Sequence, residues 1–151
     1  MIGALIGRGH VYSASHRFNA VGSGTTVAVR INVPVGYVWD TYLKIGADGI
    51  CQFDLYENPA FVTAGTAVDL VNLDRPSGGA PNTTFYYAPT MANNGTLLLS
   101  TVIGDSNAEF GRIAEEPPWR FGADDYLLLI TNQSGGAIEV GVQVLGFEET
   151  A

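Results

Sequence analysis

Two histidines, His10 and His16, carry the most versatile side chains for chemistry, and both fall in one segment near the start of the sequence. If that segment is a regular strand, six residues at about 3.3 Å each place the two side chains on one face, roughly 20 Å apart. A metal ion needs its nitrogen ligands at about 2 Å. The sequence therefore predicts no metal site at these histidines.

An acidic segment further along the chain resembles a calcium-binding loop. Asp105, Asn107 and Glu109 take its first, third and fifth positions, and Glu116 takes the twelfth. The sixth position is Phe110, where the sharp turn of such a loop requires glycine. We therefore expect a solvated acidic loop without bound calcium.

Two pairs of adjacent acids, Glu115-Glu116 and Asp124-Asp125, have the residue types used in sugar hydrolysis. That reaction needs two carboxyl groups about 5 to 10 Å apart across a cleft, whereas adjacent acids on loops are usually only solvated. Cys51 falls on the apolar face of a predicted strand and is expected to be a buried small hydrophobe. No Gly-x-Ser-x-Gly elbow and no glycine-rich phosphate loop occur. We predict that the protein is not an enzyme and uses no cofactor.

The net charge of the chain limits the classes of partner that it can bind. Of the 151 residues, 15% are charged, and 15 acids against seven Lys and Arg give a net charge of -8. Nucleic acids and anionic membranes require clustered basic residues, so neither is predicted as a partner. Because an average soluble protein has about 25% charged residues, much of this surface must be uncharged or covered by a partner.

The elements that must position any site are β-strands. Apolar and polar residues alternate with a period of two, most clearly in 25–33. The same pattern recurs in four other segments: 10–18, 38–45, 50–56 and 137–147. Turn residues at Asp48-Gly49 and at 132–136 predict hairpins. We therefore predict an all-β, jelly-roll-type two-sheet β-sandwich of about eight strands, with one long loop.

The segment 58–103 repeats itself. Pro59 is followed after five residues by Gly65-Thr66 and an apolar strand, and Pro89 is followed after five residues by Gly95-Thr96 and another. Proline fixes φ and glycine admits positive φ, so each half is predicted to leave a sheet, turn and return. Two copies are too few for a solenoid, which needs at least about three. We interpret them as two related connections within one sandwich.

Two segments do not fit the compact pattern. The long loop 104–125 shows no strand signal, and its Pro117-Pro118 stiffens the approach to Trp119, Arg120 and Phe121. These three residues are of the types that anchor interfaces, and we predict that they bind a partner. The alternative is that Trp119 and Phe121 cap the end of the sandwich.

Residues 1–8 form an apolar arm ahead of a single domain, 9–151. The arm brings Ile2, Leu5 and Ile6 without an obvious pairing strand, so we predict that these side chains contact a partner. The apolar run precedes Arg8, whereas a secretion signal carries its charge first, and it is too short to span a membrane. We expect neither function for it.

Several turn and strand-end motifs resemble those of a type of small tailed-phage protein. They are Tyr56-Glu-Asn-Pro59, Gly65-Thr66, Asn72-Leu-Asp-Arg75, Pro89-Thr90, Gly95-Thr96, Tyr126-Leu-Leu-Leu-Ile-Thr-Asn132 and Val144-Leu-Gly-Phe-Glu148. Such proteins are similar to jelly-roll decoration, or cement, proteins. The resemblance implies a virion structural protein on the outer capsid surface that stabilises the shell. The implied partners are the major capsid protein and further copies of the chain, with a trimer expected.

Two other classes remain open from the sequence. A carbohydrate-binding module or receptor-binding tip would also be a β-sandwich, with Tyr56, Tyr86, Tyr87 and Trp119 as stacking platforms for sugars, although aromatic residues in strands more often belong to the core. Another virion part, such as a tail or neck protein, would share this composition. A glycan array tests the first class, and labelling of intact particles tests the second.

Overall fold

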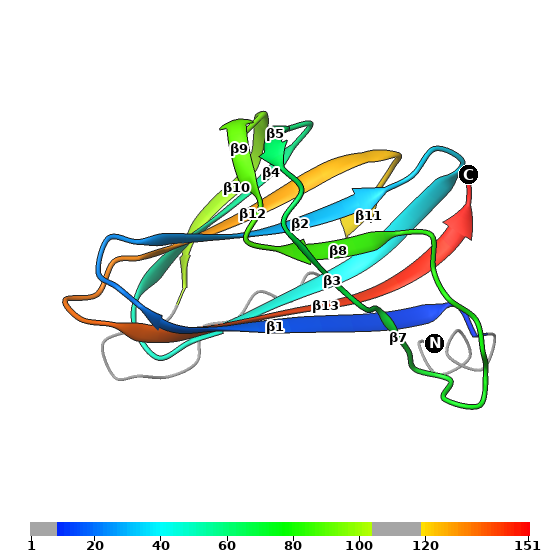
Figure 1. Ribbon diagram of the computed structural model, residues 1–151, viewed down its shortest axis with the longest axis horizontal. Helices are drawn as coiled ribbons and strands as arrows, with labels where there is room; N and C mark the ends of the chain where they lie inside the picture. Colours follow the sequence, from blue (N-terminus) through cyan, green and yellow to red (C-terminus); the bar gives the residue numbers. More distant parts are fainter. Residues whose placement is uncertain (1–8, 104–118) are drawn as a thin grey trace.

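The computed structural model describes residues 9–103 and 119–151, and every regular element within them is a β-strand. Two antiparallel sheets pack face to face (Figure 1). This arrangement confirms the predicted all-β, jelly-roll-type two-sheet sandwich. The predicted arm, 1–8, and most of the predicted long loop, 104–118, lie outside the described residues. Within the described ranges, no helix is long and apolar enough to cross a membrane.

Each sheet is named here by its number of strands. The five-stranded sheet has the spatial order β11 (Trp119–Phe121), β3 (Tyr37–Ala47), β13 (Ile138–Thr150), β1 (Val11–Val21) and β7 (Val71–Asn72). The six-stranded sheet has the order β10 (Thr96–Ile103), β4 (Cys51–Glu57), β12 (Asp124–Asn132), β2 (Thr26–Val33), β8 (Thr84–Tyr87) and β6 (Thr66–Val68). Two further strands, β5 (Ala60–Thr63) and β9 (Thr90–Asn93), pair with each other. The described chain has thirteen strands and not about eight, because six of them span only two to four residues, too few to show a period.

The hairpins predicted at Asp48-Gly49 and at 132–136 are wrong, because each of these turns carries the chain from one sheet to the other. β3 lies in the five-stranded sheet and β4 in the six-stranded sheet, and β12 and β13 are likewise divided. A turn sequence permits a reversal but does not choose the partner strand. Two half-apolar strands that face each other across the core bury their apolar sides as well as neighbours in one sheet do. Strands β1 to β4 alternate between the sheets in this way.

The core lies between the two sheets. Its largest fully buried side chains are aromatic and come from both sheets: Trp39, Phe53, Phe85 and Phe121. Cys51 is buried among them, as predicted. Burial raises the pKa of its thiol to about 11, so the group stays protonated and unreactive at neutral pH.

The repeated segments form two equivalent crossings between opposite ends of the six-stranded sheet. The first leaves β4 at Asn58, adds β5 and returns as β6, which pairs with β8. The second leaves β8 at Ala88, adds β9 and returns as β10, which pairs with β4. Asn58 and Ala88 both have positive φ, 54° and 55°, and Gly65 and Gly95 have φ of 91° and 85°. The interpretation as two related connections is confirmed.

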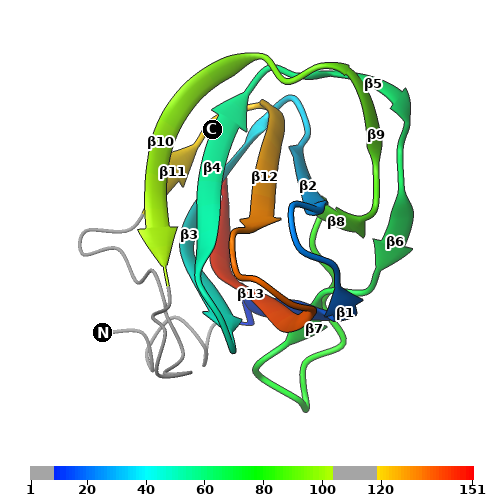
Figure 2. The same cartoon turned by 90° about the vertical axis from the view of Figure 1, so that its left-hand side faces the viewer.

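β5 and β9 form a two-stranded ribbon, here called the ribbon, on one flank of the sandwich (Figure 2). The hydroxyl oxygens of Thr63 and Thr90 lie 2.8 Å apart across it. The ribbon packs on the outer side of the six-stranded sheet through a second apolar cluster. That cluster contains Ala28, Leu127 and Leu129 from the sheet, with Tyr56, Phe61 and Met91 packed against them.

Candidate functional site

The predicted anchor residues lie in a strand and not in a loop. Trp119, Arg120 and Phe121 form β11, which pairs with β3, and β12 begins at Asp124, so the predicted loop 104–125 ends earlier than expected. Phe121 is 1% exposed and stacks on Tyr126 with ring centres 3.8 Å apart. A partner could contact Phe121 only if β11 left the sheet. Three residues that alternate apolar, charged and apolar are too few to reveal a strand from sequence.

Arg120 is exposed and neutralises two acids of its own chain. Its guanidinium lies 3.0 Å from the carboxylate of Asp40 on β3 and 2.7 Å from that of Glu149 on β13. The hydrogen bond from Arg120 lowers the pKa of Glu149, whereas burial raises the pKa of Asp40. Arg120 therefore fastens the edge strand β11 to its neighbours, and a partner contact by this residue stays a prediction.

Replacing Trp119 tests whether the edge strand β11 stabilises the fold. Its side chain is half-buried, packs against the core, and keeps a buried indole N–H without an acceptor among the described residues. We expect Trp119→Ala to lower the free energy of unfolding by about 2 kcal/mol, below the 3 to 5 kcal/mol of a fully buried aromatic. Urea unfolding measures this change. Unchanged stability together with weaker partner binding would instead support the anchor role.

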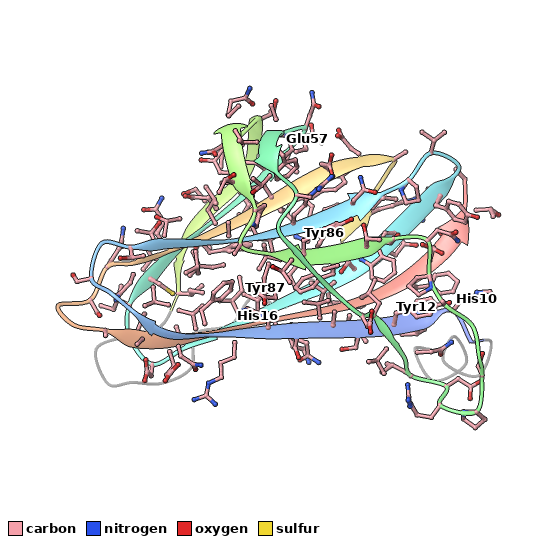
Figure 3. All side chains as sticks on the ribbon, viewed as in Figure 1. His10, Tyr12, His16, Glu57, Tyr86 and Tyr87 are labelled. Atoms are coloured by element: carbon pink, nitrogen blue, oxygen red, sulfur yellow. The ribbon has the colours of Figure 1, made fainter. Side chains whose placement is uncertain are left out.

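The other residues singled out in the sequence have structural partners. His16 and Tyr87, both labelled in Figure 3, stack with ring centres 3.7 Å apart, and burial lowers the pKa of the imidazole. Asp125 accepts hydrogen bonds from Arg30 and Asn32 at 2.8 and 2.9 Å and is therefore tied into the sheet. Across the described residues, no three possible ligand side chains gather around a metal position. Ile2, Leu5 and Ile6 lie outside these residues, so their partner role stays a prediction.

The ribbon and the edge strand β10 present a surface without charge. Residues 58–68 and 88–103 contain no Asp, Glu, Lys or Arg, although the whole chain has 22 such residues, 15 acidic and seven basic. We call the exposed part of these two segments the neutral surface. Its apolar side chains include Val62, Leu97 and Val102, which are 70%, 51% and 59% exposed. Sequence reasoning found the repeat but missed this surface, which the charge-free runs in both halves could have indicated.

Arg30 holds the neutral surface in place. Its guanidinium carbon lies 4.3 Å from the ring centre of Phe61 on the ribbon and 4.8 Å from that of Tyr86 on β8. Its Nε also donates to Asp125 at 2.8 Å. A cation fixed between two aromatic rings joins the ribbon to three strands of the sheet, so the neutral surface is presented as a preformed element.

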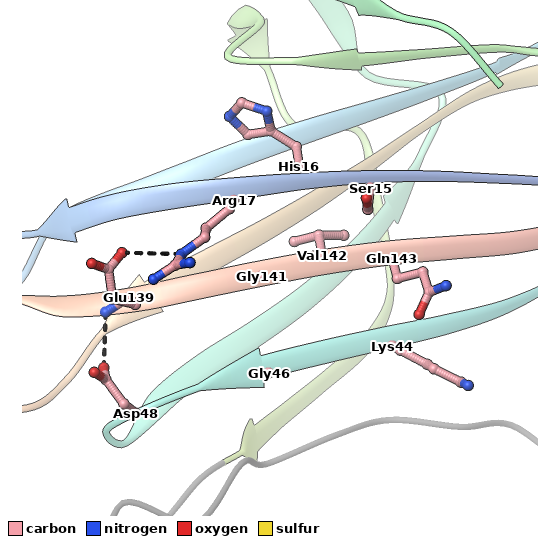
Figure 4. A pocket seen from close by; sticks show the side chains of 10 residues that line it. All are labelled: Ser15, His16, Arg17, Lys44, Gly46, Asp48, Glu139, Gly141, Val142 and Gln143. Atoms are coloured by element: carbon pink, nitrogen blue, oxygen red, sulfur yellow. Dashed lines mark hydrogen bonds and ion pairs between the residues drawn. The ribbon is translucent and has the colours of Figure 1, made fainter. Parts of the chain in front are cut away.

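A groove of about 760 Å³ lies on the outer face of the five-stranded sheet, over β1, β3 and β13 (Figure 4). Pairing register arranges its lining in rows across the three strands. Lys44, Gln143 and Ser15 make one row, and Gly46, Gly141 and Arg17 make the next. Asp48 and Glu139 close one end, where the Glu139 N–H donates to Asp48 Oδ1 at 2.8 Å.

No protein-family model matches the chain, and no curated protein matches its sequence. Among solved structures, the insecticidal delta-endotoxin Cry8Ea1 from Bacillus thuringiensis is 12% identical with a TM-score of 0.37, over 90% of this chain and 20% of its own. PirA is 10% identical with a TM-score of 0.36, over 89% and 93% of the two chains. The decameric BFDV capsid protein is 8% identical with a TM-score of 0.24, over 93% and 96%. The chain thus spans about a fifth of the endotoxin, and these weak likenesses assign no function.

Proposed function

We propose that this protein is a virion structural protein that binds the outer surface of the capsid through its neutral surface and strengthens the shell. The observation that carries the proposal is the exposed, charge-free surface of the ribbon and β10 on a chain of net charge -8. The centres of protein interfaces are depleted in charge. A surface of Ala, Val, Thr, Leu and Asn side chains is therefore suited to a protein partner.

The motifs that resemble tailed-phage decoration proteins support this assignment. Tyr56-Glu-Asn-Pro59 forms the exit from β4, and Gly65-Thr66 and Gly95-Thr96 form the two returns. These residues build the crossings that carry the neutral surface. The remaining acidic surface would face solvent and keep unbound copies soluble. We further propose that copies associate as trimers where capsid subunits meet, with the major capsid protein as the common partner.

Val62 and Val35 provide a matched test of the neutral surface. Val35 is 90% exposed in the turn between β2 and β3, outside the ribbon and β10. Val62→Asp should weaken binding to capsids of the source virus by about 2 kcal/mol, roughly 30-fold, because it buries a charge in the interface. Val35→Asp adds the same charge and should bind like the parent protein. Both variants should unfold like the parent, since surface substitutions cost about 0.5 kcal/mol or less.

Co-sedimentation of labelled protein with purified particles that lack it measures the binding. Equal loss for both variants would show a general charge effect and not a docking surface. Absence of any binding by the parent protein, or its absence from intact virions by immunogold labelling, would contradict the capsid role.

A further inference from the structure

The groove lies on the outer face of the five-stranded sheet, whereas the ribbon packs on the outer side of the six-stranded sheet. These two sheets form opposite sides of the sandwich (Figure 1). Its floor is formed where Gly46 on β3 stands directly opposite Gly141 on β13. Neither residue supplies a side chain, so the outer face of the sheet is hollow between the Lys44 row and the Asp48–Glu139 end (Figure 4).

Packing does not explain the glycine at position 141. A β-carbon there would meet nothing closer than the Gly46 carbonyl oxygen at 3.9 Å, and its φ is not positive. Gly146 on the same strand is different, because a β-carbon there would overlap the indole of Trp39. Glycine within a strand weakens it and often marks a place where a ligand approaches the backbone. The hollow at Gly141 is therefore an observation that the fold alone leaves unexplained.

Among the described residues, some charged groups around the hollow have bonding partners and one has no ion-pair partner. Glu139 faces Arg17 at 3.7 Å, and Asp48 accepts the backbone N–H of Glu139. Lys44 is exposed, is the single lysine of the chain, and makes no ion pair with any described residue. Among the described residues, the groove of this acidic protein thus presents one cation, Lys44, that no carboxylate pairs with.

We propose that the groove binds an acidic saccharide, with a sugar ring over Gly46 and Gly141 and its carboxylate at Lys44. The α-carbons of the two glycines and the methylene stems of Lys44 and Arg17 offer apolar contact to the C–H face of the ring. Gln143 and Ser15 offer donors and acceptors to hydroxyl groups. The hollow lets the sugar ring approach the backbone of the two glycines. The ammonium group of Lys44 favours an acidic sugar over a neutral one. This site is independent of the neutral surface, and both can be occupied together.

Isothermal titration with a set of uronic- and sialic-acid oligosaccharides, each beside its neutral methyl ester, tests the proposal. At least one acid should bind, and its ester should bind at least tenfold more weakly. Lys44→Met should weaken binding of the acid about tenfold. Arg75→Met removes the same charge outside the groove, from another exposed cation with no ion pair among the described residues, and should leave binding unchanged.

The variant Gly141→Val distinguishes an effect on saccharide binding from an effect on folding. Valine suits a strand, and the space above Gly141 accepts a β-carbon, so this variant should fold at least as stably as the parent. It should nevertheless abolish saccharide binding by filling the hollow. The proposal is overturned if no acid in the set binds at millimolar concentration, if esters bind equally well, or if Gly141→Val binds like the parent.

Discussion

Replacing Gly95 by alanine is expected to lower the free energy of unfolding by about 3 to 5 kcal/mol, because two independent costs add. Gly95 has a φ of 85°, a conformation that costs an L-residue about 1 to 2 kcal/mol. Its β-carbon would also overlap the backbone oxygen of Glu57, at the point where the second crossing passes the first. Backbone cannot rotate aside as a side chain can, so the crossing itself must shift.

Three glycines with positive φ separate the two costs. Gly24 has a φ of 74° and open space at its β-carbon position, so Gly24→Ala measures the conformational cost alone, about 1 to 2 kcal/mol. Gly65 is the counterpart of Gly95 in the first repeat, and its β-carbon would lie 2.6 Å from the Tyr87 carbonyl oxygen. Urea unfolding should rank the losses Gly24, Gly65, Gly95 in increasing order. Equal losses for Gly24 and Gly95 would mean that the close crossing contributes nothing.

The repeat could be predicted because its determinants are local. Proline, and glycine with positive φ, restrict the backbone at fixed positions, and Pro59 with Gly65 and Pro89 with Gly95 have the same spacing. The pairing of β5 with β9 could not be predicted, because each strand has only four residues and its partner comes from the other repeat. The neutral surface depends on that pairing. The two charge-free segments can be read from the sequence, but their coming together in the fold cannot.

Long-range register limited the rest of the sequence interpretation. The five alternating segments contain most of the core residues, since one face of such a strand must be buried in whichever sheet it lies. The groove needs Gly46 opposite Gly141, which only the register between β3 and β13 establishes. Glu148 illustrates the same limit. Acids are rarely buried, but Glu148 is buried and accepts hydrogen bonds from both the backbone and the side chains of Asn82 and Thr83.

Gly146→Ala is expected to cost about 3 kcal/mol, at the upper end of the range for overpacked cores. Gly146 lies on β13 in register with Thr41 on β3, and the indole of Trp39 fills the space where its side chain would stand. Trp39 is fully buried among other core residues, so its ring can move only by displacing its neighbours. The added methyl group must therefore displace a large aromatic ring from the centre of the sandwich.

Gly141→Ala is the control on the same strand, because both glycines lie within β13 and neither has positive φ. Its β-carbon enters open space, and alanine restricts the unfolded chain more than glycine does, so stability should rise by about 0.5 to 1 kcal/mol. Circular dichroism during urea unfolding measures both variants. If Gly146→Ala loses no more stability than Gly141→Ala, Trp39 can repack and glycine is not required beneath it. A loss confined to Gly146→Ala would show that one strand contains a glycine needed for packing and another that the fold does not need.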